Sequence, residues 1–110
     1  MTIEDVLRAV SWRFAMRRHQ LIGFSREASS SVPRQLAMFF SRRYVEPTPT
    51  YQDLGAWFGR DHKTVMYGIE QTGRRLLEDA DLVDDAIAVA DRIEAQRRVE
   101  RQLAERSAAA

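Results

Sequence analysis

The sequence predicts an all-α fold, a small bundle of about six helices that contains a helix-turn-helix. Only three prolines and five glycines interrupt the 110 residues, and β-branched residues are sparse. Apolar residues recur at spacings of three and four along each longer segment, which is the helical period. A chain of this length folds as one small domain around a single modest core.

The first helix is expected over residues 3–16. Thr2 is its expected N-cap, and Glu4 and Asp5 stand in the first turn, where the helix dipole favours acidic side chains. A short helical turn is expected over 19–23, followed by a serine-rich loop over 24–32. The apolar face of the first helix consists of Ile3, Val6, Leu7, Val10 and Phe14, with Trp12 at its edge.

Another helix is expected over residues 33–44. Pro33 stands at its first position, where the missing N–H costs nothing. Residues 45–49 then form a rigid turn, because Pro47 and Pro49 bias the residues before them away from the helical conformation. The inward side of this helix carries Leu36, Phe39, Phe40 and Tyr44.

Residues 50–68 predict two helices joined by a tight turn. Thr50 and Asp53 have the spacing of a capping box, Gly59 tolerates the left-handed conformation that ends a helix, and Asp61 can cap the second helix. The shared face of the first helix is Tyr51, Leu54, Trp57 and Phe58. The inner stripe of the second is Val65, Ile69 and Thr72, with Met66 and Gly73 beside it.

The second helix of this pair begins with a polar turn. A helix-turn-helix presents such residues to the major groove of DNA. Lysine donates to guanine, aspartate accepts from cytosine, and threonine donates or touches a thymine methyl group. Polar residues at a helix start also serve simply as caps, and spacing alone leaves both interpretations open.

The last helix is expected from Leu82 onward, capped by Asp79 or Asp81, with a stripe of Val83, Ile87, Ala90 and Ile93. From residue 94 the sequence is charged and poor in large apolar residues. We therefore divide the chain into a helix-turn-helix domain over 1–93 and a charged tail over 94–110, helical or disordered.

Charge is unevenly distributed along the chain. Residues 1–75 hold twelve Lys or Arg and seven Asp or Glu, a net charge of +5, whereas residues 76–110 hold five and nine, a net charge of −4. A basic front part suits a protein with one face toward a polyanion. The chain has no cysteine and no apolar run near ~18 residues, so we expect no thiolate metal site, no membrane helix and a place in the cytoplasm.

Two motifs carry a resemblance to a known family. The run from Phe58 to Val65, FGRDHKTV, resembles the FGGRDHTTV signature of the C-terminal DNA-binding domain of DnaA, the bacterial replication initiator. The run from Pro33 to Met38, PRQLAM, resembles the start of a helix in the same domain. The resemblance covers about residues 3–90 and implies a Trp-repressor/DnaA domain IV-like helical bundle.

The resemblance also implies a set of DNA contacts. Base contacts in the major groove would come from Asp61, His62, Lys63 and Thr64, and a base contact in the minor groove from Arg26 in the loop. The DNA backbone would be held by Arg34, Gln35, Arg42 and Arg60.

This sequence departs from the family pattern at four places. Lys63 replaces a threonine, one glycine is missing before Arg60, and the 45–49 turn is about two residues longer. The loop over 24–32 keeps Arg26 but is less basic than in the family. Weaker binding is expected, because neutralisation of phosphates supplies much of the affinity of proteins for DNA.

No GxxxxGK[ST] phosphate loop occurs in the sequence, so we expect no ATPase module, no nucleotide and no cofactor. Asp61 and His62 are adjacent on a helix, about 100° apart, and do not predict an enzyme. The predicted function is binding of double-stranded DNA at DnaA-box-like sites at the nucleoid, modulating replication initiation or transcription without ATPase activity. The alternative is a module that contacts DnaA, the replicative helicase or another replication factor, with reduced DNA binding.

Overall fold

The computed structural model describes residues 1–22 and 30–109, and within them it contains six helices and no strand. The all-α fold is thereby confirmed. The expected helix-turn-helix is formed by α4 and α5. The helices are α1 (Ile3–Phe14), α2 (Arg18–Leu21), α3 (Ser31–Tyr44), α4 (Tyr51–Phe58), α5 (His62–Arg75) and α6 (Ala80–Ala109).

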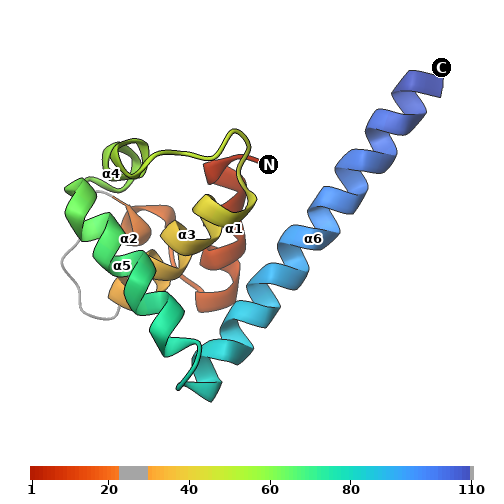
Figure 1. Ribbon diagram of the computed structural model, residues 1–110. Coiled ribbons are helices and arrows are strands. Elements are labelled where there is room, and N and C mark those ends of the chain that lie inside the picture. The colour runs from red at the N-terminus through yellow and green to blue at the C-terminus, as the bar shows by residue number, and fades with distance from the viewer. Residues whose placement is uncertain (23–29, 110) are drawn as a thin grey trace.

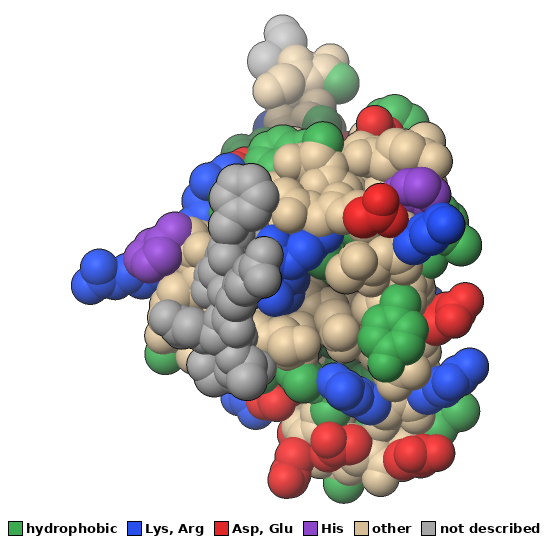
Figure 2. Space-filling model, turned by 90° about the vertical axis from the view of Figure 1, so that its left-hand side faces the viewer, with side chains coloured by type: hydrophobic (Ala, Val, Ile, Leu, Met, Phe, Trp, Pro, Cys, Tyr) green, Lys and Arg blue, Asp and Glu red, His purple; other side chains and the backbone are tan. Residues whose placement is uncertain are grey.

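α1 and α3 lie at the centre of the bundle (Figure 1). α5 packs along α3 on one side, and α6 packs on α1 on the other. The second half of α6 projects away from the other helices. The face that carries α5, on the left of Figure 1, is turned toward the viewer in Figure 2.

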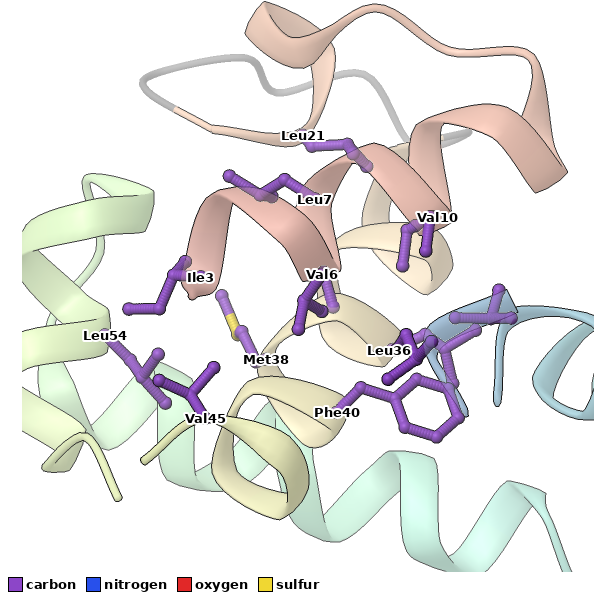
Figure 3. Packing of buried hydrophobic residues seen from close by; sticks show 14 of the residues in the cluster. Ile3, Val6, Leu7, Val10, Leu21, Leu36, Met38, Phe40, Val45 and Leu54 are labelled. Atoms are coloured by element: carbon purple, nitrogen blue, oxygen red, sulfur yellow. The ribbon is translucent and has the colours of Figure 1, made fainter. Parts of the chain in front are cut away.

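The core is formed where α1 and α3 meet and is closed by α4, α5 and α6. Figure 3 shows Val6 and Val10 of α1 directed toward Leu36 and Phe40 of α3, with Leu54 of α4 at the edge of the same cluster. Burial of such side chains stabilises by about 1.5–3 kcal/mol each. This cluster holds the helix-turn-helix rigidly on the rest of the domain.

Several helix boundaries differ from those expected. α1 ends at Phe14 instead of residue 16, because Ala15 adopts the left-handed conformation (φ 51°) and caps the helix. α3 begins at Ser31, two residues early, so Pro33 occupies the third helical position. Proline is tolerated there because first-turn N–H groups have no partner within the helix. Of the loop expected over 24–32, residues 24–29 lie outside the described residues, and 31–32 belong to α3.

Three residues of the predicted apolar faces are exposed to solvent instead of packing in the core. Trp57 is 38% exposed, Met66 is 39% exposed and Ile87 is 53% exposed. α6 packs on α1, and this turns inward a face that shares only Ile93 with the one expected. That inward face consists of Leu82, Ala86, Val89 and Ile93.

α6 is continuous from Ala80 to Ala109, so residues 94–109 are helical. Its start is capped by Asp79, whose Oδ1 accepts a hydrogen bond from the Leu82 N–H at 3.1 Å. The last core residue of the helix is Ile93. The division of the chain at residue 93 stays a prediction.

Candidate nucleic-acid interface

The helix-turn-helix begins with a fully formed capping box at the start of α4. The Asp53 N–H donates to the Thr50 hydroxyl, and the Thr50 N–H donates to the Asp53 carboxylate, both at 3.0 Å. These two bonds satisfy two backbone donors that a helix start would otherwise leave unpaired. Hydrogen bonding from Thr50 to the Asp53 carboxylate, first from the Thr50 N–H and then from its hydroxyl, holds the pKa of Asp53 below its ordinary value.

The turn between α4 and α5 depends on two glycines. Gly59 has φ 63°, the left-handed conformation expected of it. Gly55 accepts a hydrogen bond from the Arg60 N–H at 2.9 Å. A Cβ on Gly55 would lie 2.5 Å from the Arg60 carbonyl oxygen, so only glycine lets the turn fold back this closely.

The start of α5 gathers four of the five residues for which base contacts are predicted. Asp61 caps the helix, with its Oδ1 accepting from the Lys63 N–H at 2.7 Å. His62 Nδ1 lies 3.7 Å from the same oxygen. Asp61, Lys63 and Thr64 are exposed, His62 is partly exposed, and Val65 is buried beneath them. The geometry presents a carboxylate, an imidazole, an ammonium and a hydroxyl together on one helical turn.

α5 packs closely on the first turns of α3. A Cβ on Gly68 would lie 3.0 Å from Cγ of Gln35 and 3.5 Å from Sδ of Met38, which shows how near the two helices come. The Gln35 Oε1 also accepts a long hydrogen bond, 3.4 Å, from Arg75. Gln35 is therefore a half-buried residue at the seam between α3 and α5.

Arg34, predicted as a contact to the DNA backbone, is buried in the described structure. Its side chain is only 7% exposed. Nε donates to the Leu21 carbonyl at 3.0 Å, and an Nη donates to the Gln20 carbonyl at 3.3 Å. Burial, and then the nearby charge of Arg60, hold the pKa of Arg34 below its ordinary value. Sequence spacing does not reveal this burial, because it does not show that α2 ends against the start of α3.

The other two arginines of the predicted backbone set also contact the protein. Arg60 is half-buried and donates to the carbonyls of Phe58 and Gly59 at 3.3 and 3.2 Å, at the end of α4. Arg42 donates to the Pro49 carbonyl at 2.9 Å, and its guanidinium lies 4.3 Å from the ring centre of Tyr51. These arginines stabilise the turns on either side of α4. Arg26 lies outside the described residues.

Sequence reasoning missed the part of α5 that follows its first turn. Tyr67 is 58% exposed, and Met66, Glu70 and Arg74 are exposed with it. They stand three, four, seven and eleven residues after Lys63, so they continue the same helical face. This helical spacing from Lys63 is the sequence signal that could have identified these residues. Figure 2 shows that Lys and Arg side chains are spread across this side of the molecule, with Asp and Glu side chains among them and also at its lower edge.

Other kinds of site find little support in the described part of the chain. Residues 1–22 and 30–109 contain no cluster of three His, Cys, Asp or Glu side chains that could hold a metal ion. None of the described helices is long and apolar enough to span a membrane.

Comparison with known proteins identifies one family. The model of the bacterial dnaA protein helix-turn-helix matches residues 3–71. Similar proteins include chromosomal replication initiator proteins DnaA. That of Chloroflexus aggregans is 34% identical over 98 residues, covering 88% of this chain and 20% of the relative. That of Roseobacter denitrificans is 33% identical over 86 residues (77% and 18%), and that of Treponema pallidum 37% over 83 residues (74% and 18%). The matched part of this chain thus spans about a fifth of the length of these relatives.

Proposed function

This chain belongs to the family of the bacterial DnaA helix-turn-helix, and from that premise we propose that it binds double-stranded DNA at sites similar to the DnaA box. The observation that carries the proposal is the first turn of α5. Its polar side chains stand together at an exposed helix start, above a turn that Gly55 and Gly59 hold tightly. A recognition helix in the major groove uses this arrangement.

The base contacts follow from the chemistry of that turn. Lys63 donates to guanine O6 and N7, Asp61 accepts from a cytosine amino group, and Thr64 contacts a base edge or the adjacent phosphate. His62 adds a further base contact. Arg26 enters the neighbouring minor groove, where arginine is favoured by the negative potential.

The DNA backbone is held by the residues around the helix-turn-helix. We assign this role to Arg34, Gln35, Arg42 and Arg60, which lie at the start of α3 or flank α4. In the described structure the three arginines donate hydrogen bonds to nearby backbone carbonyls, and Gln35 accepts one from Arg75 between α3 and α5. Their phosphate contacts therefore form on binding.

Binding of this kind modulates chromosomal replication initiation, or transcription, by occupying DnaA-type boxes in the bacterial cytoplasm. The 110 residues hold no phosphate loop. We therefore propose that the chain acts at the nucleoid without binding nucleotide and without catalysing a reaction.

The test compares His62→Ala and Arg26→Ala with the unaltered chain on a duplex that carries a DnaA-type box. Each loss is expected to weaken binding by ~5-fold or more, since a good base contact contributes about 1–3 kcal/mol. His19→Ala and Arg106→Ala are matched controls, because both residues are exposed and lie outside the proposed interface. Binding that is indifferent to His62 and Arg26 alike would contradict the proposal.

A second candidate function is supported by a groove between α3 and α6. It encloses about 390 Å³, and its lining includes Phe39, Leu76, Val83 and the exposed Ile87. Arg43 lines one side, and the exposed Asp84 and Asp91 flank Ile87 on α6. This charge pattern suits an amphipathic helix with acidic residues toward Arg43 and basic residues toward α6.

On this alternative the groove receives such a helix from DnaA, the replicative helicase or another replication factor. Ile87→Arg would then abolish binding to the purified partner while leaving DNA binding within twofold. If Ile87→Arg binds both the partner and DNA normally, the groove is not the partner-binding site.

A further inference from the structure

The second half of α6 extends beyond the bundle and exposes apolar side chains (Figure 1). Val99 is 55% exposed, and Leu103, one turn later, is 58% exposed. This half also contacts its own domain, because Glu100 lies 3.8 Å from the Met1 amino group. Successive helical residues point about 100° apart, so that contact uses a side of α6 different from the one that carries Val99. The exposed apolar side is left for another molecule.

The same side of α6 continues toward the start of the helix. Steps of three or four residues back from Leu103 stay on one side of a helix, and they end beside α1. There the Arg92 guanidinium lies 4.4 Å from the ring centre of Trp12, which is itself 50% exposed. We call the whole surface the outer face of α6. It consists of Ala88, Arg92, Ala95, Val99 and Leu103, together with Trp12.

The charge of α6 changes sign along its length. Residues 80–91 hold four Asp and no basic residue, a net charge of −4, whereas residues 92–109 hold five Arg and three Glu, a net charge of +2. A second copy of this helix lying parallel would place like charges together. A second copy lying antiparallel places the acidic half of each helix against the basic half of the other, and the helix dipoles favour the same direction.

We propose that the outer face of α6 binds the outer face of a second copy of this chain, with the two α6 helices antiparallel. Such a contact has twofold symmetry and uses the same surface on both copies. Full overlap of the helices places Ala80 of one copy level with Ala109 of the other.

This register brings the exposed apolar side chains together. Val99 and Leu103 of one copy lie level with residues 90 and 86 of the other, and thus beside its Trp12 and Ala88. Removal of these side chains from water stabilises the pair. Ala95 lies next to the twofold axis, where a small side chain lets the two helices approach closely.

The register also pairs opposite charges at the edge of the outer face. Asp91 and Arg98 are both exposed, and they stand seven residues apart on one flank of the helix. Antiparallel pairing of identical helices brings equivalent flanks together. Asp91 of each copy therefore lies level with Arg98 of the other, and the twofold axis makes two such ion pairs.

The proposed pair leaves the face proposed for DNA free, because α5 and α6 pack on different sides of the bundle. Each dimer carries two copies of α5, while a single box needs one. The inference goes beyond the proposed function and does not depend on it, since self-association is measured without DNA.

The experiment is sedimentation equilibrium of the full chain without DNA. The unaltered chain should approach twice its mass of 12.7 kDa, with a dissociation constant of ~1–100 µM, as suits a small interface. Val99→Glu and Leu103→Glu should each weaken self-association by ~10-fold or more, because each places two carboxylates in the contact. All three side chains changed in this series are exposed, and circular dichroism checks that the variants keep their helix content.

Ile87→Glu is the matched control. Ile87 is an apolar residue of α6 with 53% exposure, but it lies outside the outer face. Its substitution should change the dissociation constant by less than twofold. Equal weakening by Ile87→Glu and Leu103→Glu would overturn the inference, because it would move the contact to the groove between α3 and α6.

Charge reversal tests the direction of the helices. Asp91→Arg and Arg98→Asp should each weaken self-association by ~2-fold or more, since each turns two attractive surface pairs into repulsive ones. An equimolar mixture of the two variants should regain the affinity of the unaltered chain, because every arginine then meets an aspartate. In a parallel pair residue 91 meets residue 91, and neither substitution alone would weaken it.

Two results would overturn the inference directly. One is an unaltered chain that stays monomeric at ~500 µM, and the other is a mixture that associates no better than its two components. Self-association by a chain that fails to bind DNA would instead contradict the proposed function and leave this inference standing.

Discussion

Gly55 and Gly73 show how differently two glycines in neighbouring helices are used. A Cβ on Gly55 would meet the Arg60 carbonyl oxygen at 2.5 Å, whereas a Cβ on Gly73 meets nothing within 4 Å. The sequence indicated Gly59 as the residue that ends α4. It did not indicate Gly55, because the need for glycine there arises from the return of the chain at Arg60, which only the folded turn shows.

Gly55→Ala should therefore destabilise the protein by about 1–3 kcal/mol, the usual cost of forcing extra atoms into a packed site. Gly73→Ala is the matched control and should stabilise by about 0.5–1 kcal/mol, because alanine is the better helix former. Chemical denaturation of both variants tests this. Equal effects of the two substitutions would show that the α4–α5 turn is looser than the structure has it.

Lys63 is the one lysine of the sequence, and it stands exposed on the first turn of α5. The family resemblance predicts a threonine at this position, and a long cation changes what the turn can contact. Lys63 either shifts base preference toward guanine or adds a phosphate contact with looser specificity.

The substitution Lys63→Thr tests whether Lys63 contacts a base or a phosphate. A base contact predicts a changed preference among box variants, and a phosphate contact predicts a salt slope smaller by about one. Arg106→Gln, on an exposed part of α6 outside the proposed interface, controls for the loss of one positive charge. A variant with unchanged preference and unchanged salt slope would rule out both roles.

Residue-level prediction succeeded where the determinants are local. The capping roles of Thr50, Gly59 and Asp61 follow from neighbours within three residues, and the structure has all three. Arg34 shows the opposite case. Its side chain is buried against carbonyls thirteen and fourteen residues away in the sequence, and a local sequence pattern cannot predict a contact with residues that far along the chain.

At the scale of elements, α6 combines a packed half with a projecting half. Its core residues end at Ile93, and beyond them the contacts to the bundle are polar. The Met1 amino group lies 3.8 Å from Glu100, and the Arg97 guanidinium lies 5.5 Å from the ring centre of Tyr44. The helical period was readable from sequence. The inward face was not, because it depends on how α6 meets α1.

A chain that ends after Ile93 should therefore remain folded. Surface pairs of this kind contribute about 0–1 kcal/mol each, so Tm should fall by less than about 8 °C and DNA affinity should change less than twofold. Ile93→Ala in the full chain is the contrasting variant, because deleting a buried isoleucine costs about 2–5 kcal/mol. A truncated chain as unstable as Ile93→Ala would refute the division of the chain at residue 93.

At the scale of the whole molecule, the helices separate two surfaces. α5 and the start of α3 form the face proposed for DNA, and the seam of α3 with α6 carries the apolar groove. Charge follows the same separation, because the first half of α6 holds Asp81, Asp84, Asp85 and Asp91 and no basic residue before Arg92. An acidic stretch away from the DNA face suits a protein that approaches a polyanion from one side.

The measurement that tests this account most directly is fluorescence anisotropy at ~150 mM salt, with one duplex that carries a DnaA-type box and one scrambled duplex. A sequence-specific reader prefers its site by ~10³-fold or more, and that preference is the result expected here. Equal and strongly salt-dependent binding to both duplexes, or binding to neither, would contradict the assignment of α5 as a recognition helix.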